Sequence, residues 1–179
     1  MYIVYENHTR NKELLKYAQT DALTGLYNKE TTEQLTDELL SEDENKYHAF
    51  LILDVDCFKQ INDIYGHAVG DIVLQKFGKL LKGTFREGDI LGRIGGDEFG
   101  VIMKNIQTKD IAMKKAEELL AKTQAYKIDE LKGNNISISI GISTAPQDGD
   151  CYMDLYKRAD QALYQAKRSG KARVCNYFS

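Results

Sequence analysis

The feature that most constrains this chain is the pentapeptide Gly-Gly-Asp-Glu-Phe at residues 95–99, which lies between two apolar segments. Apolar residues on both sides indicate two strands. The glycines favour a tight hairpin turn, since glycine permits positive φ and leaves no Cβ. The adjacent carboxylates of Asp97 and Glu98 repel each other unless a cation neutralises them. The pentapeptide therefore predicts phosphate contacts at Gly95 and Gly96 beside a divalent metal, with a plain turn bearing solvated acids as the alternative.

A second acid follows a continuous apolar run at residues 49–54, which ends at Asp54. Such a run is typical of a buried central strand that delivers a carboxylate at its end. Together with the hairpin acids, this carboxylate suits Mg²⁺, a hard cation that leaves room for phosphate. A calcium-binding helix–loop–helix is excluded. After Asp54-x-Asp56, Lys59 stands where that loop requires glycine and Tyr65 stands where it requires glutamate.

Composition sets the class of protein. The chain has 179 residues, 42% hydrophobic and 28% charged, as expected for one globular domain. A net charge of −3 offers no basic surface for nucleic acid or an anionic membrane. The three cysteines, at positions 57, 151 and 175, are odd in number and far apart in the sequence, which predicts free thiols in a reducing cytoplasm. We expect no signal peptide, and no apolar run reaches the roughly 18 residues that span a bilayer.

Apolar periodicity predicts helices interleaved with a few strands. The helices are expected over residues 5–19, 28–41, 71–85, 109–122 and 152–168, with a short helical turn through Ile61 and Ile64 before Gly66 and Gly70 as breaks. The strands are expected at 49–54, in a hairpin over 90–103, at the alternating isoleucines 136–142 on a half-covered sheet, and over 173–178. This pattern indicates an α/β (α+β) domain with a central, mainly antiparallel sheet of about five strands flanked by helices.

Several motifs occur in one order from about residue 21 to residue 174, and by them the chain resembles the GGDEF-domain diguanylate cyclases. These are bacterial signalling enzymes that condense two GTP molecules into the second messenger cyclic di-GMP and release two pyrophosphates. The motifs are Asp21-Ala-Leu-Thr-Gly-Leu-Tyr-Asn28, Leu53-Asp-Val-Asp-Cys-Phe-Lys59, Ile61-Asn-Asp-Ile-Tyr-Gly-His67, Gly70-Asp71, Arg86-Glu-Gly-Asp89, Arg93-Ile-Gly-Gly-Asp-Glu-Phe99, Ser139-Ile-Gly-Ile142 and Arg158-Ala-Asp-Gln-Ala-Leu-Tyr-Gln-Ala-Lys167. The resemblance implies a nucleotidyl-cyclase-like, ferredoxin-like palm. A lead-in signalling helix is expected at residues 1–20 and the catalytic domain at 21–179.

The resemblance implies a metal site and a catalytic acid. Its ligands would be the Asp54 carboxylate, the Val55 carbonyl, Asp97 and Glu98, around Mg²⁺ or, in its place, Mn²⁺. Asp97 would also take the proton from the attacking 3′-hydroxyl, and Glu98 would assist a second metal. Two cations about 3.5–4 Å apart would stabilise the attacking and leaving oxygens.

The resemblance also implies that Asn62 and Asp71 bind guanine. A carboxylate accepts from the N1–H and the N2 amino group of guanine, whereas adenine has no donor at N1, so Asp71 would disfavour adenine. Structural roles are the alternatives. An acid is favoured at a helix start, where Asp71 is expected, and Asn62 suits an ordinary turn.

Phosphate-binding positions follow from the same resemblance. They are Phe58, Lys59, Gly95, Gly96, Lys167 and Lys171. The chain departs from the family where Gly170-Lys171-Ala172 replaces the common Gly-Arg-Asn, so a point charge replaces a bidentate guanidinium. Cys57 stands where histidine is frequent, at a position that contributes mainly backbone. His67 is expected as a packed loop histidine.

Arg86 and Asp89 match the Arg-x-x-Asp pair that in the family forms an inhibitory site for cyclic di-GMP. A surface salt bridge between residues i and i+3 is the alternative.

The resemblance implies an enzyme that acts as a homodimer through its active-site face, with product inhibition. A cytosolic location, without nucleic acid or direct membrane insertion, and a possible upstream sensor domain complete the expectation. Two other functions are weighed: a catalytically silent module that senses GTP or cyclic di-GMP, and a cyclase with another base specificity. The presence of Asp54, Asp97 and Glu98 argues against the first, and Asp71 argues against the second.

Overall fold

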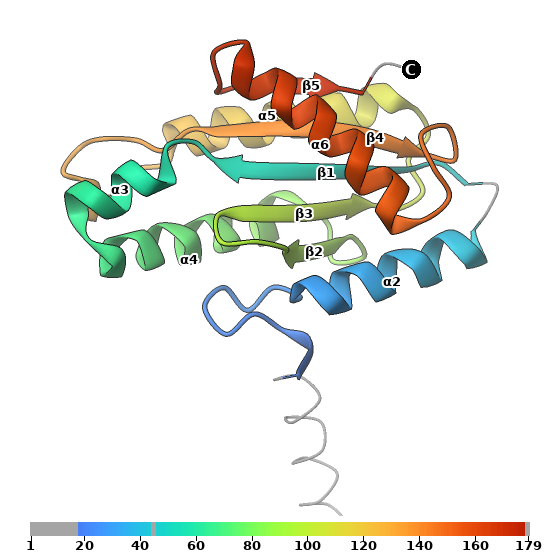
Figure 1. Cartoon of the computed structure of the whole chain (residues 1–179), viewed down its shortest axis with the longest axis horizontal. Helices are drawn as coiled ribbons and strands as arrows, with labels where there is room; N and C mark the ends of the chain where they lie inside the picture. The colour runs from blue at the N-terminus through green and yellow to red at the C-terminus, as the bar shows by residue number, and fades with distance from the viewer. Residues whose placement is uncertain (1–17, 44–45, 178–179) are drawn as a thin grey trace, which may run out of the picture.

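The computed structural model describes residues 18–43 and 46–177, which fold around a five-stranded sheet of order β2-β3-β1-β4-β5 (Figure 1). The strands are β1 (His48–Val55), β2 (Ile90–Arg93), β3 (Glu98–Met103), β4 (Ile138–Ala145) and β5 (Val174–Asn176). The pairs β1–β3, β1–β4 and β2–β3 are antiparallel, and β4–β5 is parallel. The predicted α+β fold with a mainly antiparallel sheet is confirmed.

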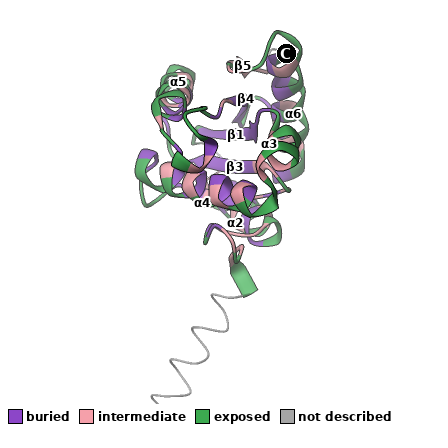
Figure 2. Cartoon of the chain, turned by 90° about the vertical axis from the view of Figure 1, so that its left-hand side faces the viewer, coloured by how far each residue is buried: buried purple, intermediate pink, exposed green. Residues whose placement is uncertain are grey.

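Helices cover both faces of this sheet. They are α2 (Lys29–Glu42), α3 (Phe58–Tyr65), α4 (His67–Thr84), α5 (Lys109–Ala125) and α6 (Tyr152–Arg168), with a short 3₁₀ turn at Asp129–Leu131. Figure 1 shows α2 and α6 in front of the sheet and α4 and α5 behind it. Figure 2 shows the strands buried between these layers. The central strand therefore has no solvent-facing side.

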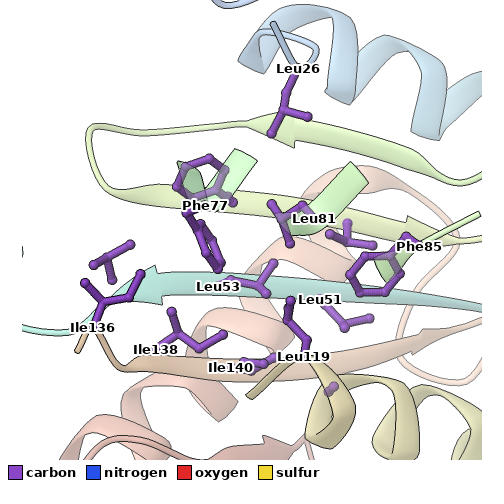
Figure 3. Packing of buried hydrophobic residues seen from close by; sticks show 14 of the residues in the cluster. Leu26, Leu51, Leu53, Phe77, Leu81, Phe85, Leu119, Ile136, Ile138 and Ile140 are labelled. Carbon is purple, nitrogen blue, oxygen red and sulfur yellow. The ribbon is translucent and has the colours of Figure 1, made fainter. Parts of the chain in front are cut away.

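The side chains of β1 alternate between two apolar clusters, and every residue of the strand is buried. Leu51 and Leu53 face the α4–α5 side, which Figure 3 shows together with Phe77. Phe50 faces the α2–α6 side, where its ring meets Tyr152 at a centroid distance of 5.5 Å. Because a one-residue slip would exchange these two sets, the register of β1 is strongly specified. The position of its final carboxylate is specified with it.

The prediction that β4 lies on a half-covered sheet is wrong, because all eight of its residues are buried. Helix α5 packs on one side of the strand and α6 on the other. A Cβ on Gly141 would lie 2.1 Å from the Ala159 carbonyl oxygen and 2.3 Å from the Leu163 nitrogen. The backbone of α6 therefore rests directly on β4, and only glycine fits beneath it.

The segment between β1 and β2 holds two helices rather than a turn and one helix. Gly66, at φ 85°, separates α3 from α4. Helix α4 begins at His67 and not at residue 71, so Gly70 lies within the helix and is not a break as predicted. His67 is exposed at the start of α4, which corrects its assignment as a packed loop histidine.

The ends of the chain test the remaining expectations. Residues 18 and 19 are helical, and the rest of the predicted lead-in helix lies outside the described residues. Strand β5 ends at Asn176, so it is shorter than the predicted strand over 173–178. Cysteines 57, 151 and 175 are free, as predicted. Among the described helices, none combines the length and apolar character that crossing a membrane requires.

Candidate active site

The predicted metal and phosphate residues come from four segments that meet at one end of the sheet. These are the end of β1, the turn between β2 and β3, the start of α3, and the last turn of α6 with the loop that follows it (Figure 1). Asp54 and Glu98 are direct cross-strand partners. The Val55 amide donates to the Asp97 carbonyl oxygen at 3.2 Å. The fold thus brings together acids that are far apart in the sequence.

Asp54 is the most buried of these acids, with 7% of the residue exposed. Burial raises the pKa of its carboxyl group, while the Lys167 ammonium, 2.7 Å from Oδ2, opposes that rise. The charges of Asp97 and Asp56 raise the pKa further. One ammonium therefore does not fully compensate the ionised carboxylate.

Glu98 is half-buried at the first position of β3. Burial raises the pKa of its carboxyl group, and the neighbouring Asp54 charge adds to the shift. A Cβ on Gly95 would lie 2.8 Å from Glu98 Oε2, whereas a Cβ on Gly96 would meet nothing within 4 Å. Neither glycine has positive φ, contrary to the sequence argument. Gly95 instead leaves room for the close approach of the Glu98 side chain.

Arg93, for which no role was predicted, holds the turn between β2 and β3. Arg93 donates from Nε and Nη2 to the Gly96 carbonyl oxygen at 3.1 and 2.7 Å. Its Nη1 forms an ion pair with Asp21 Oδ2 at 3.2 Å. Both residues lie in motifs quoted for the family resemblance, but local spacing cannot pair side chains so distant in the chain. The clamp fixes the backbone that carries Asp97.

The predicted metal ligands are neighbours but not a closed cluster. The described residues whose ligating atoms all lie within 4.8 Å of one another are Asp150, Cys151 and Asp154, at the start of α6, and not the hairpin acids. Carboxylates without a cation repel one another, and Lys167 is here the nearest positive charge to Asp54. Hard anionic oxygens with raised pKa values fit a divalent cation, which would relieve the excess negative charge. The metal site stays a prediction.

Asn62 and Asp71, predicted to bind guanine, lie on the neighbouring helices α3 and α4. Asn62 is half-buried, and its Oδ1 is buried without a hydrogen-bond partner. A Cβ on Gly70 would lie 1.9 Å from that oxygen, so glycine makes room for the amide. Asp71 is exposed at the next position. A buried polar atom without a partner is costly, and a ligand donor would satisfy it.

The predicted phosphate contacts lie around the start of α3. Phe58 and Lys59 form its first turn, where backbone N–H groups attract anions. Lys171 follows α6 and places its Nζ 3.1 Å from Cys57 Sγ, beside the same helix start. Lys59 and Lys171 are exposed, whereas Lys167 is half-buried. Cationic groups therefore flank the acids on the side of α3 and α6.

Arg86 and Asp89 lie away from this region, before the opposite end of β2. Asp89 Oδ1 accepts from Arg86 Nε at 3.0 Å and from the Lys104 amide at 3.1 Å, and its Oδ2 accepts from the Arg86 amide at 3.3 Å. Arg86 also donates to the Lys104 carbonyl oxygen. The salt bridge weighed as the alternative is therefore present. Both residues also line an open cavity of about 570 Å³ with Phe85, Met103 and Lys115.

Comparison with known sequences places these features in a family. The model of the family described as diguanylate cyclase, GGDEF domain, matches residues 18–173. Diguanylate cyclase A of Treponema denticola is 37% identical over 170 residues, which cover 92% of this chain and 46% of the relative. Response regulator PleD of Caulobacter vibrioides is 37% identical over 177 residues, covering 95% and 39%. The chain spans about half, or less, of the length of these curated relatives.

Solved structures agree with the sequence comparison. The coiled coil and GGDEF domain of DgcB from Caulobacter crescentus, in complex with c-di-GMP, has a TM-score of 0.89 at 25% identity and covers 98% of this chain and 94% of that one. The GGDEF domain of TpbB from Pseudomonas aeruginosa has a TM-score of 0.84 at 33% identity, covering 89% and 94%. By sequence and by fold, this chain belongs to the GGDEF-domain family of diguanylate cyclases.

Proposed function

We propose that this domain is a diguanylate cyclase that condenses two GTP molecules into cyclic di-GMP and releases two pyrophosphates. The observation that carries the proposal is the pairing of Asp54 with Glu98, two acids with raised pKa values, beneath a glycine turn and beside Lys167. Buried acids with excess negative charge next to cationic groups suit a site that holds metal and triphosphate together.

Each acid has a proposed role. Asp54, the Val55 carbonyl, Asp97 and Glu98 would hold Mg²⁺, with Mn²⁺ as a substitute, and the cation would supply positive charge to the reacting phosphate. Asp97 sits on the turn that Arg93 clamps, and it would accept the proton of the attacking 3′-hydroxyl. Rigid support of the turn suits a residue that must meet a reacting atom.

Lysines would bind the triphosphate. Lys59 lies in the first turn of α3, Lys171 places its Nζ beside Cys57 before that turn, and Lys167 pairs with Asp54. The amides of Phe58 and Lys59 would meet phosphate oxygens. With a cation bound to the Asp54 carboxylate, Lys167 would no longer be needed to neutralise it and would be free to pair with a phosphate. The glycines at 95 and 96 would leave the turn backbone accessible to the nucleotide.

Asn62 and Asp71 would select guanine. The unpartnered Oδ1 of Asn62 is the supporting observation, because it is a buried acceptor for which Gly70 leaves room. Exposed Asp71 would accept from the N1–H and N2 groups of the base. Adenine has neither a donor at N1 nor an amino group at C2, so it would leave the Asp71 carboxylate without these donors.

One domain would hold one GTP, so the reaction requires two domains. We propose a homodimer in which the active-site faces meet and each 3′-hydroxyl attacks the partner's α-phosphate. Residues 21–179 would form the catalytic unit, and residues 1–20 would connect it to an upstream sensor that controls pairing. The Arg86–Asp89 site would bind cyclic di-GMP and inhibit the enzyme, a proposal that the c-di-GMP complex of the similar DgcB domain supports.

Product analysis tests the proposal. The purified chain is incubated with GTP, ATP or both in the presence of Mg²⁺, and the products are separated by chromatography. We expect cyclic di-GMP from GTP alone and none from Asp97→Ala. Binding of GTP without any cyclic dinucleotide, even at high protein concentration, would contradict the enzyme and favour a silent sensor. An adenine-containing product would contradict the assigned base specificity.

A further inference from the structure

Asp56 has a more elaborate set of partners than the acids of the proposed metal site. It is 6% exposed. Its Oδ1 accepts from Ser139 Oγ at 2.7 Å, and its Oδ2 accepts from Ser137 Oγ at 2.8 Å and from the Ala172 amide at 3.1 Å. Both carboxylate oxygens therefore have donors inside the protein. Three of its roughly four lone-pair sites are occupied, so this carboxylate has little capacity left for a cation.

The Ala172 amide belongs to a loop with an unusual backbone. Gly170, Lys171 and Ala172 have φ values of 112°, 61° and 48°. Left-handed conformations are unfavourable for residues with a Cβ, so Lys171 and Ala172 need compensating contacts. The amides of both residues make such contacts: Lys171 donates to the Ala166 carbonyl oxygen at 3.0 Å, and Ala172 donates to the Asp56 carboxylate at 3.1 Å.

The conformation of this loop determines where the Lys171 ammonium lies. Its Nζ is 3.1 Å from Cys57 Sγ, at the start of α3. Cys57 itself has φ 58° and directly follows Asp56 in the chain. Asp56 thus joins two left-handed segments, the backbone at Cys57 and the Gly170–Ala172 loop, and links both to β4 through Ser139.

We propose that Asp56 is a positioning residue that holds the Gly170–Ala172 loop so that Lys171 faces the nucleotide phosphates. The inference rests on the proposed function for the identity of the ligand. The hydrogen bond between the Ala172 amide and Asp56 does not depend on that function. Lys171 is a flexible point charge rather than a bidentate arginine. A lysine at this position therefore depends on its backbone for placement.

Nucleotide binding tests the proposal. α,β-Methylene-GTP, which cannot be cyclised, is titrated calorimetrically into the wild-type chain and into Asp56→Ala, Lys171→Ala and the double variant. We expect Asp56→Ala to lose roughly tenfold in affinity and the double variant to lose little beyond Lys171→Ala. Binding of guanosine, followed by NMR, should stay unchanged, since it carries no phosphate. Full additivity, an unchanged nucleotide affinity or an equal loss for guanosine would overturn the proposal.

Hydrogen exchange separates this inference from the proposed function. The amides of residues 170–173 should exchange faster in Asp56→Ala than in the wild type. Ser143→Ala is the matched control, because it removes a buried hydroxyl of β4 that donates to the Leu155 carbonyl oxygen, away from the loop. If the wild-type chain binds no GTP analogue, the proposed function fails while faster exchange still supports the loop contact. Unchanged exchange would overturn the contact itself.

Folding could fail in the alanine variant, so Asp56→Asn is the second one. Asparagine keeps the shape and one acceptor oxygen, and it should give a smaller change of the same pattern: weaker binding of the triphosphate, unchanged binding of guanosine and faster exchange at the loop. A folded Asp56→Asn whose loss is equal for both ligands would contradict a role exerted through Lys171.

Discussion

The two ends of the β2–β3 hairpin use carboxylates in opposite ways. At the turn, Asp54 and Glu98 lie side by side with raised pKa values, and Lys167 is the cation that pairs with Asp54. At the open end, Asp89 receives three hydrogen bonds from Arg86 and Lys104. The turn end therefore retains negative charge that the protein does not fully compensate. At the open end, hydrogen bonds within the protein satisfy the Asp89 carboxylate.

This difference indicates that the acids of the turn end serve activity, whereas the acid of the open end serves stability. Uncompensated buried charge costs folding free energy, and proteins retain it where a ligand will supply the missing partner. A carboxylate whose hydrogen bonds are all internal stabilises the loop that it closes. The turn end is therefore expected to tolerate charge removal structurally while losing activity, and the open end to lose stability.

The largest effect is expected at Asp54. Asp54→Asn should lower cyclase activity by about 10³-fold, because it removes a charge that we propose ligates the metal. The same change should raise the free energy of unfolding by about 1 kcal/mol, since it removes a buried charge with a raised pKa. Activity is measured by chromatography and stability by urea unfolding without metal. A lower free energy of unfolding in Asp54→Asn than in the wild type would contradict the expected difference between the two ends.

Gly95→Ala should have the next largest effect, a loss of about 10²-fold in activity. The new Cβ would displace the Glu98 carboxylate, whose Oε2 would lie 2.8 Å away. Gly88→Ala is the matched control at the open end, where a Cβ would meet nothing within 4 Å. Initial rates of both variants provide the comparison. Equal rates in the two variants would show that the approach of Glu98 to Gly95 has no catalytic consequence.

At the open end, Asp89→Asn should destabilise the fold by about 2 kcal/mol, opposite in sign to Asp54→Asn. Asparagine offers one acceptor oxygen where the carboxylate uses two, and its amino group would face the Arg86 or Lys104 donors. Urea unfolding of the two variants under one condition measures the difference. If both variants were stabilised, the proposed division between the two ends would be wrong.

The smallest effect is a dependence on pH. The folded state binds a proton at Asp54 more tightly than the unfolded state, whose carboxyl has a pKa near 3.8. Its contribution to stability therefore falls as the pH rises from 3.8 through the raised folded pKa. The difference in melting temperature between the wild type and Asp54→Asn should follow this curve without metal. Saturating Mg²⁺ should reverse its direction, since the cation favours the ionised form.

Local patterns predicted the elements but not the contacts between them. The apolar run before Asp54 and the glycine turn sufficed to place a strand and a hairpin, because strand period and turn chemistry are local. The clamp of Arg93 on Asp21 and the bonds that converge on Asp56 join distant segments, so spacing gave no sign of them. Gly70 was wrongly predicted to break the helix. Its lack of a Cβ instead leaves room for the Asn62 amide on the neighbouring helix.

The central claim is that a divalent cation binds at the turn end of the hairpin. Electron paramagnetic resonance of Mn²⁺ with GTP measures the protein-bound metal directly. The account predicts bound Mn²⁺ in the wild-type chain, its loss in Asp54→Asn, and full retention in Asp150→Asn/Asp154→Asn, which disrupts the other acidic cluster. Undiminished binding in Asp54→Asn, or a loss that follows the double variant instead, would contradict it.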